Sequence, residues 1–133
     1  MPKLIAGLVA LMLLASPAAA SILRIDLTRA NQATSPVAYT LKTSKASGLV
    51  IVDLAVARDQ APLAHLWRID LVLRKGKRTV VSAPLATTVD GASLTTQLIL
   101  DPTAMRSAEI WIRTGEHAPL AETVYVIDVG SFR

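Results

Sequence analysis

Residues 65–83 have the sequence HLWRIDLVLRKGKRTVVSA, and they decide the fold class. Their first half alternates between an inward set and an outward set: His65, Trp67, Ile69, Leu71 and Leu73 against Arg68, Asp70 and Arg74. A period of two residues is that of a half-buried β-strand. Residues 78–83 supply the returning strand, and Gly76 supplies the positive φ that a tight hairpin turn demands. The stretch therefore predicts a β-hairpin.

The same alternation recurs along the chain and predicts eight strands: 23–28, 37–42, 49–57, 65–74, 78–83, 94–100, 109–113 and 124–129. Residues 49–57 are apolar on both faces except at Asp53, which predicts a central strand. Residues 85–89 are ambiguous, and Asp90-Gly91 predicts a turn. Asp101-Pro102 predicts the cap and first residue of a short helix through Ser107.

Eight short strands at roughly ten-residue spacing, with one short helical corner, predict an all-β fold. We expect an antiparallel β-sandwich of immunoglobulin or fibronectin-III type with about seven or eight strands, and a small barrel is the alternative. The similarity is one of architecture only, because the Cys-Trp-Cys core of an antibody domain is missing. Architecture by itself does not assign a function.

The first 20 residues have the three parts of a cleavable secretory signal peptide. Lys3 is the basic start, residues 4–14 are an apolar run, and small residues end at Ala20. We predict cleavage after Ala20, which leaves residues 21–133 as a single β-sandwich domain. An uncleaved membrane anchor is less favoured, because the apolar run is about half of the roughly 20 residues that cross a bilayer.

The charge balance excludes a strongly basic nucleic-acid binder. The chain has 14 Lys and Arg against 10 Asp and Glu, and loss of Lys3 with the signal leaves an excess of about three. It contains no cysteine, so packing and hydrogen bonds alone must hold the domain. A bacterial envelope protein, periplasmic or secreted, is the class that fits.

The sequence contains almost no recognisable catalytic motif. The sequence has no cysteine nucleophile, no Gly-x-Ser-x-Gly elbow and no phosphate-binding Gly-rich loop. A catalytic or metal site built from loops would have to use His65, His117 and Asp59. The spacing of these residues matches no known metal-ligand pattern. We therefore predict no catalytic residue, no metal and no cofactor.

Two features suggest binding surfaces. Four cations surround the predicted hairpin turn, Arg74, Lys75, Lys77 and Arg78, and suit an anionic polymer or lipid head groups, or else a solvated turn. Trp111 lies between Glu109 and Arg113 on the outward face of its strand, where an indole either packs under a loop or anchors a contact. Nucleic acid is disfavoured, because no aromatic residues interleave the cations.

The favoured function is a non-enzymatic binding or assembly module that contacts another envelope or secreted protein, through a sheet face or an open strand edge. The first alternative is a small exported enzyme or enzyme subunit, with loops around His65 and His117 at one end of the sandwich. The second is a binder of anionic envelope polymers through the hairpin at 74–78. After signal cleavage, no membrane-spanning segment is expected.

Overall fold

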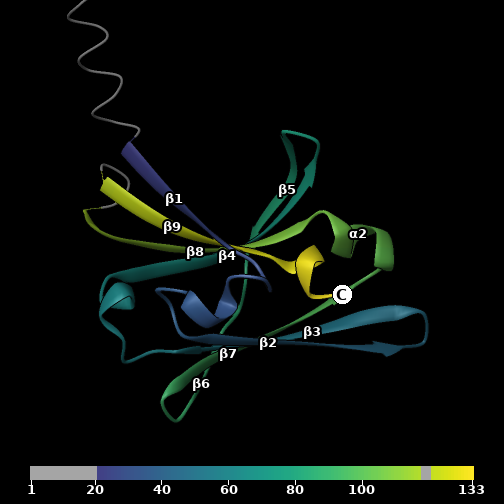
Figure 1. Ribbon diagram of the computed structural model, residues 1–133, viewed down its shortest axis with the longest axis horizontal. Helices are drawn as coiled ribbons and strands as arrows, with labels where there is room; N and C mark the ends of the chain where they lie inside the picture. The colour runs from purple at the N-terminus through teal and green to yellow at the C-terminus, as the bar shows by residue number, and fades with distance from the viewer. Residues whose placement is uncertain (1–20, 118–120) are drawn as a thin grey trace, which may run out of the picture.

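Two β-sheets form the described part of the chain, residues 21–117 and 121–133 of a computed structural model (Figure 1). The five-stranded sheet has the order β1 (Ser21–Leu27), β9 (Ala121–Asp128), β8 (Ala108–His117), β4 (Leu66–Lys75) and β5 (Arg78–Pro84). The four-stranded sheet has the order β2 (Tyr39–Ala46), β3 (Leu49–Ala57), β7 (Ser93–Leu100) and β6 (Thr88–Asp90). Within these residues the sheets stay separate, so the barrel alternative was wrong.

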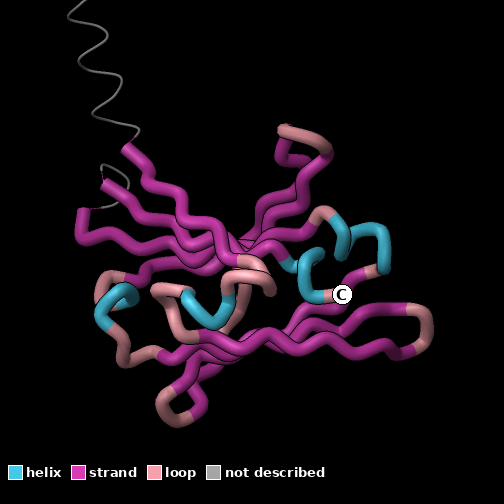
Figure 2. Tube along the Cα trace, viewed as in Figure 1, coloured by secondary structure: helices cyan, strands magenta, loops and turns pink. Residues whose placement is uncertain are grey.

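The two sheets face each other as two layers, and short helical segments lie at the ends of the strands (Figure 2). These segments are α2 (Pro102–Arg106) and the 3₁₀ turns η1 (Gln32–Thr34), η2 (Ala61–Leu63) and η3 (Val129–Phe132). Asp101 caps α2 as predicted, because its Oδ1 accepts a hydrogen bond from the Ala104 amide at 2.7 Å.

One hydrophobic core fills the space between the sheets. It is built from the alternate apolar side chains of the strands, including Val52 and Leu54 of β3 and Ile110 and Ile112 of β8. β3 is a central strand as predicted, but only one of its faces is buried. The alternating pattern therefore identified the inward residues of most strands correctly.

The structure differs from the expectation in two strands. The ambiguous segment contributes β6, a three-residue strand paired with β7, which raises the described total to nine. β1 runs parallel to β9, from Ser21 opposite Ala121 to Leu27 opposite Ile127. All other pairs are antiparallel. A strand pattern carries no information about its partner, so the parallel pair was not predictable.

Three tight turns between strands have a glycine at positive φ. Gly76 has φ +64° between β4 and β5, and Gly91 has φ +59° between β6 and β7, as the two turn predictions require. The turn between β2 and β3 places both Ser47 and Gly48 at positive φ, which suits the right-handed twist of the flanking strands. The predicted signal peptide, residues 1–20, lies outside the described residues.

Candidate functional site

Trp111, predicted as a possible contact anchor, is held within the protein's own side chains. It lies on the outer face of the five-stranded sheet and is half-buried. Its Nε1 donates to Glu109 Oε1 at 3.1 Å, and the guanidinium carbons of Arg24 and Arg113 lie 5.7 and 5.1 Å from the ring centre. These are cation–π distances. The hydrogen-bonding and π surfaces of the indole are thus already engaged.

Arg24 joins this cluster to the edge strand β1. It donates to Asp26 Oδ1 at 2.8 Å and to Glu109 Oε2 at 2.9 Å. Burial disfavours the charged guanidinium, but the hydrogen bonds and charges of the two carboxylates outweigh it and hold the pKa of Arg24 above its ordinary value. Arg24 is therefore a permanent cation committed to this face of the sheet.

A second ion cluster is centred on Arg113. Its Nε donates to Asp70 Oδ2 at 2.8 Å and its Nη1 to Glu122 Oε1 at 2.7 Å. Arg68 Nε donates to the same Asp70 Oδ2 at 3.1 Å and lies 2.9 Å from Oδ1, which is buried and accepts no hydrogen bond. Asp70 and Glu122 are both buried. Because guanidinium groups already hold both carboxylates, they bind β4, β8 and β9 together instead of presenting a free base.

Trp67 is the exposed indole, which corrects the prediction that it faces inward. The register between β4 and β8 shifts there, since Leu66 is opposite Thr114 and Arg68 is opposite Arg113. Trp67 is the extra residue of this bulge and remains 45% exposed. It borders a hollow of about 290 Å³ whose lining includes Leu85 and Leu94. No local pattern in the sequence distinguishes a bulge from a regular strand.

The predicted basic cluster is divided by the fold. Lys75, Lys77 and Arg78 are exposed at the β4–β5 turn. Arg74 instead folds back, with its Nη2 donating to Lys77 O at 2.8 Å and its Nη1 lying 3.7 Å from Glu109 Oε1. The structure brings Arg106 of α2 to a hollow of about 350 Å³ that Arg74 and Gly76 also line. The sequence did not indicate this fifth cation.

The two histidines belong to neighbouring segments. The His65 carbonyl accepts a hydrogen bond from the Gly115 amide at 2.9 Å, two residues before His117. His65 is exposed, while the side chain of His117 lies outside the described part of the structure. No group of three His, Cys, Asp or Glu side chains among the described residues is placed to hold a metal ion.

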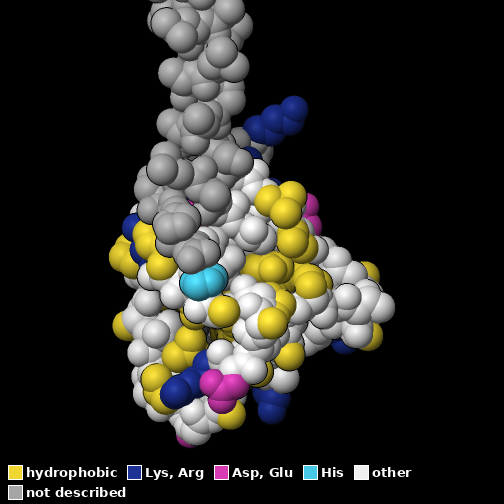
Figure 3. Space-filling model, turned by 90° about the vertical axis from the view of Figure 1, so that its left-hand side faces the viewer, with side chains coloured by type: hydrophobic (Ala, Val, Ile, Leu, Met, Phe, Trp, Pro, Cys, Tyr) yellow, Lys and Arg dark blue, Asp and Glu magenta, His cyan; other side chains and the backbone are white. Residues whose placement is uncertain are grey.

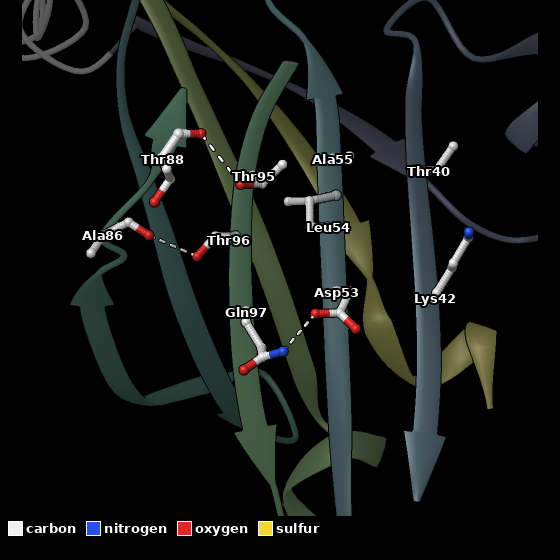
Figure 4. Close-up of a pocket in the computed structure, with 10 residues that line it drawn as sticks. All are labelled: Thr40, Lys42, Asp53, Leu54, Ala55, Ala86, Thr88, Thr95, Thr96 and Gln97. Carbon is white, nitrogen blue, oxygen red and sulfur yellow. Dashed lines mark hydrogen bonds between the residues drawn. The ribbon is translucent and has the colours of Figure 1, made fainter. Parts of the chain in front are cut away.

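A hollow of about 510 Å³ lies over the four-stranded sheet (Figure 4). Two rows of side chains cross it: Thr40, Ala55, Thr95 and Thr88 in one, and Lys42, Asp53 and Gln97 in the other. Gln97 Nε2 donates to Asp53 Oδ1 at 2.8 Å. This lining offers hydrogen bonds to a polar ligand, but it pairs no nucleophile with a base.

The end of the molecule where β1 and β9 begin also exposes apolar side chains. Ile22 and Leu23 of β1 are exposed, and Leu23 is 61% accessible although its alternation predicts an inward residue. Figure 3, which faces this end, shows hydrophobic side chains interrupting the polar surface. β1 is also an edge strand of its sheet. An exposed apolar edge is a feature that proteins usually avoid.

In the part of the chain that the structure describes, no helix is long and apolar enough to span a membrane. No known protein family matches the chain, and it matches no curated protein and no solved structure.

Proposed function

We propose that the chain is a non-enzymatic binding or assembly module of the bacterial envelope, periplasmic or secreted, that accepts an extended segment of a partner protein at the free edge of β1. The observation that carries this proposal is the contrast between β1 and the other edge strands. An unprotected edge adds a further strand through its unpaired main-chain groups.

Three edges carry features that oppose strand addition. β5 has a register shift opposite Leu73 and Arg74 and ends in Pro84. β2 carries Lys42 and Lys45, and β6 is only three residues long. Lysines, prolines, bulges and short length are the means by which natural sheets block their edges.

β1 has none of these protections. Its seven residues pair with β9 in an unbroken register and contain neither proline nor lysine. Arg24, its one cation, is bonded to Asp26 and Glu109. The one cation of this edge is therefore engaged by carboxylates of the protein itself.

The main-chain directions define which groups of β1 are free. Asn31 closes one end of the edge, because its Oδ1 accepts from the Thr28 amide at 2.8 Å and its Nδ2 donates to Asp26 O at 3.2 Å. Alternate residues of a strand direct their main-chain groups to the same side. The amides and carbonyls of Ile22 and Arg24 thus face the same edge. A partner strand bonded there would bring its apolar side chains against Leu23 and Ile25.

The strand order also supports a module of immunoglobulin type. In that fold one sheet has the order A-B-E-D and the other contains G-F-C-C′. The strands β2 to β9 can be lettered in chain order A, B, C, C′, D, E, F and G. The four-stranded sheet β2-β3-β7-β6 then has the order A-B-E-D, and strands β9-β8-β4-β5 of the other sheet have the order G-F-C-C′. β1 is then an additional strand beside G.

The test is retention of a partner by the full chain from its native envelope fraction, after cross-linking and with mass spectrometry of the bound protein. Ile22→Pro removes an amide that faces the free edge without breaking a β1–β9 bond, and should abolish retention. Ser82→Pro is the matched control. The Leu85 amide faces β4, because it donates to Ile69 O. The direction of main-chain amides alternates along a strand, so the Ser82 amide, three residues earlier, faces away from β4 and a proline there breaks no bond to β4.

Both variants should keep the wild-type fold, which far-UV circular dichroism and the melting temperature check. In the retained complex, hydrogen exchange at the Ile22 and Arg24 amides should slow. Equal retention by Ile22→Pro and wild type, or equal loss in both proline variants, would contradict strand addition at β1.

A further inference from the structure

We propose that the β4–β5 hairpin is a docking element for anionic lipid head groups, independent of partner binding at β1. The two surfaces lie on opposite edges of the five-stranded sheet. The hairpin projects beyond the two layers, with its turn farthest from the four-stranded sheet (Figure 1). A surface that approaches a flat bilayer has to project in this way.

The hairpin tip carries uncompensated positive charge. Lys75, Lys77 and Arg78 are exposed, and none of them lies within ion-pair distance of a carboxylate in the described residues. Gly76 at φ +64° allows the tight turn that brings these cations together. Each cation near an anionic leaflet strengthens binding about 5-fold, from roughly 1 kcal/mol per charge.

Apolar side chains stand beside these cations. Val80 is 57% exposed on β5, and its neighbour Val81 is exposed as well. Cations next to exposed apolar groups are the pattern of an element that lies in the membrane interface. A hairpin that only kept the protein in solution would not need two exposed valines.

The base of the hairpin offers a place for a phosphate oxygen. Arg74 lines a hollow together with Arg106 and Ser107, and its Nε is buried without a hydrogen-bond partner. A buried donor without a partner is costly, and an oxyanion would satisfy it.

Two carboxylates, Glu109 and Asp128, also line this hollow. Glu109 is already bonded to Arg24 at 2.9 Å and to the Trp111 indole at 3.1 Å, so most of its charge is compensated. With the hairpin included, the cations outnumber the carboxylates. The local field therefore favours an anion.

The experiment measures co-sedimentation of the chain with vesicles of phosphatidylglycerol and phosphatidylcholine, or of phosphatidylcholine alone. The chain is used as isolated from cells, and mass spectrometry confirms that all variants share one N-terminus. Lys75→Glu/Lys77→Glu should weaken binding to the anionic vesicles by at least 25-fold, and Val80→Ser/Val81→Ser should weaken it several-fold. Raised salt should weaken wild-type binding, whereas the zwitterionic vesicles should retain little protein.

Lys42→Glu/Lys45→Glu is the matched control, because it changes net charge equally on the exposed strand β2. It should bind like the wild type. Unchanged binding of the hairpin variant, or an equal loss in the control, would overturn the proposal. Competition by inorganic phosphate at constant ionic strength that abolishes binding to vesicles would overturn the lipid assignment in favour of a free oxyanion. Partner retention through β1 should persist in the hairpin variants, so the two proposals fail separately.

Discussion

At the scale of single residues, alternation predicts the position of one tryptophan correctly and of the other wrongly. Trp67 continues the apolar face of β4 in the sequence, but it lies at a register shift and is 45% exposed. Trp111 is on the predicted outer face and is held by Glu109, Arg24 and Arg113. An extra residue in a strand reverses the face of a side chain, because the side-chain period is two.

Tyr39 has a hydroxyl that is expected to reduce stability. Its Oη is buried without a hydrogen-bond partner. Removing an unsatisfied buried hydroxyl is neutral or stabilising by up to about 1 kcal/mol, so Tyr39→Phe should keep or raise the free energy of unfolding. Urea unfolding at neutral pH checks this. A loss of more than about 1 kcal/mol would show that the hydroxyl makes a stabilising contact.

The same substitution should change alkaline stability. Burial raises the pKa of the Tyr39 phenol above its ordinary value of 10.0, so the folded protein holds this proton more tightly than the unfolded chain. This tighter proton binding stabilises the folded state. The stabilisation is complete below pH 10 and is lost as pH rises through the folded-state pKa. In Tyr39→Phe, the fall in unfolding free energy above pH 10 should be shallower than in wild type.

At the scale of elements, buried charge links neighbouring strands. Asp70 of β4 is 1% exposed and binds Arg113 of β8, which also binds Glu122 of β9. Removing one partner leaves a buried charge with too few bonds. Asp70→Ala should therefore lower the free energy of unfolding by about 3 kcal/mol, measured by urea unfolding.

A matched control is Asp26→Ala, because Asp26 forms an exposed ion pair with Arg24. It should cost under about 1 kcal/mol. If both alanine variants lose the same small amount, the cluster around Arg113 contributes little to strand association.

The contact between α2 and η3 is another element-scale feature. A Cβ atom at Gly130 would lie 2.7 Å from the main-chain oxygen of Arg106. Gly130→Ala should destabilise the protein by about 1–3 kcal/mol, because one segment has to move. Gly48→Ala is the control for the loss of glycine's backbone freedom without a clash. A Cβ atom at Gly48 would meet no atom within 4 Å, but the residue has φ +78°. A loss of stability in Gly48→Ala, with no loss in Gly130→Ala, would contradict the packing explanation.

At the scale of the whole molecule, one core joins both sheets and brings together strands from both ends of the described chain. β1 pairs with β9, and Leu27 of β1 is buried in the same core as Val52 of the other sheet. Truncation of a buried β1 side chain should therefore affect the entire fold.

Leu27→Ala tests this cooperativity. It should cost about 2–5 kcal/mol and lower the melting temperature by about 8–20 °C, because a fully buried leucine is truncated. Far-UV circular dichroism and tryptophan fluorescence should report one coincident transition in the variant, as in a two-state domain. Separate transitions from the two probes would mean that β1 frays independently.

The sequence by itself determined the local features of this protein. Alternation located the strands around Ile69, Leu98 and Ile110, glycines at 76 and 91 marked turns, and Asp101 marked the start of α2. These depend on side-chain period and main-chain torsions, which act over a few residues. Only the tertiary structure decided the parallel β1–β9 pair, the bulge at Trp67 and the approach of Arg106 to the hairpin. Each of these depends on contacts between residues distant in the chain, which no local pattern records.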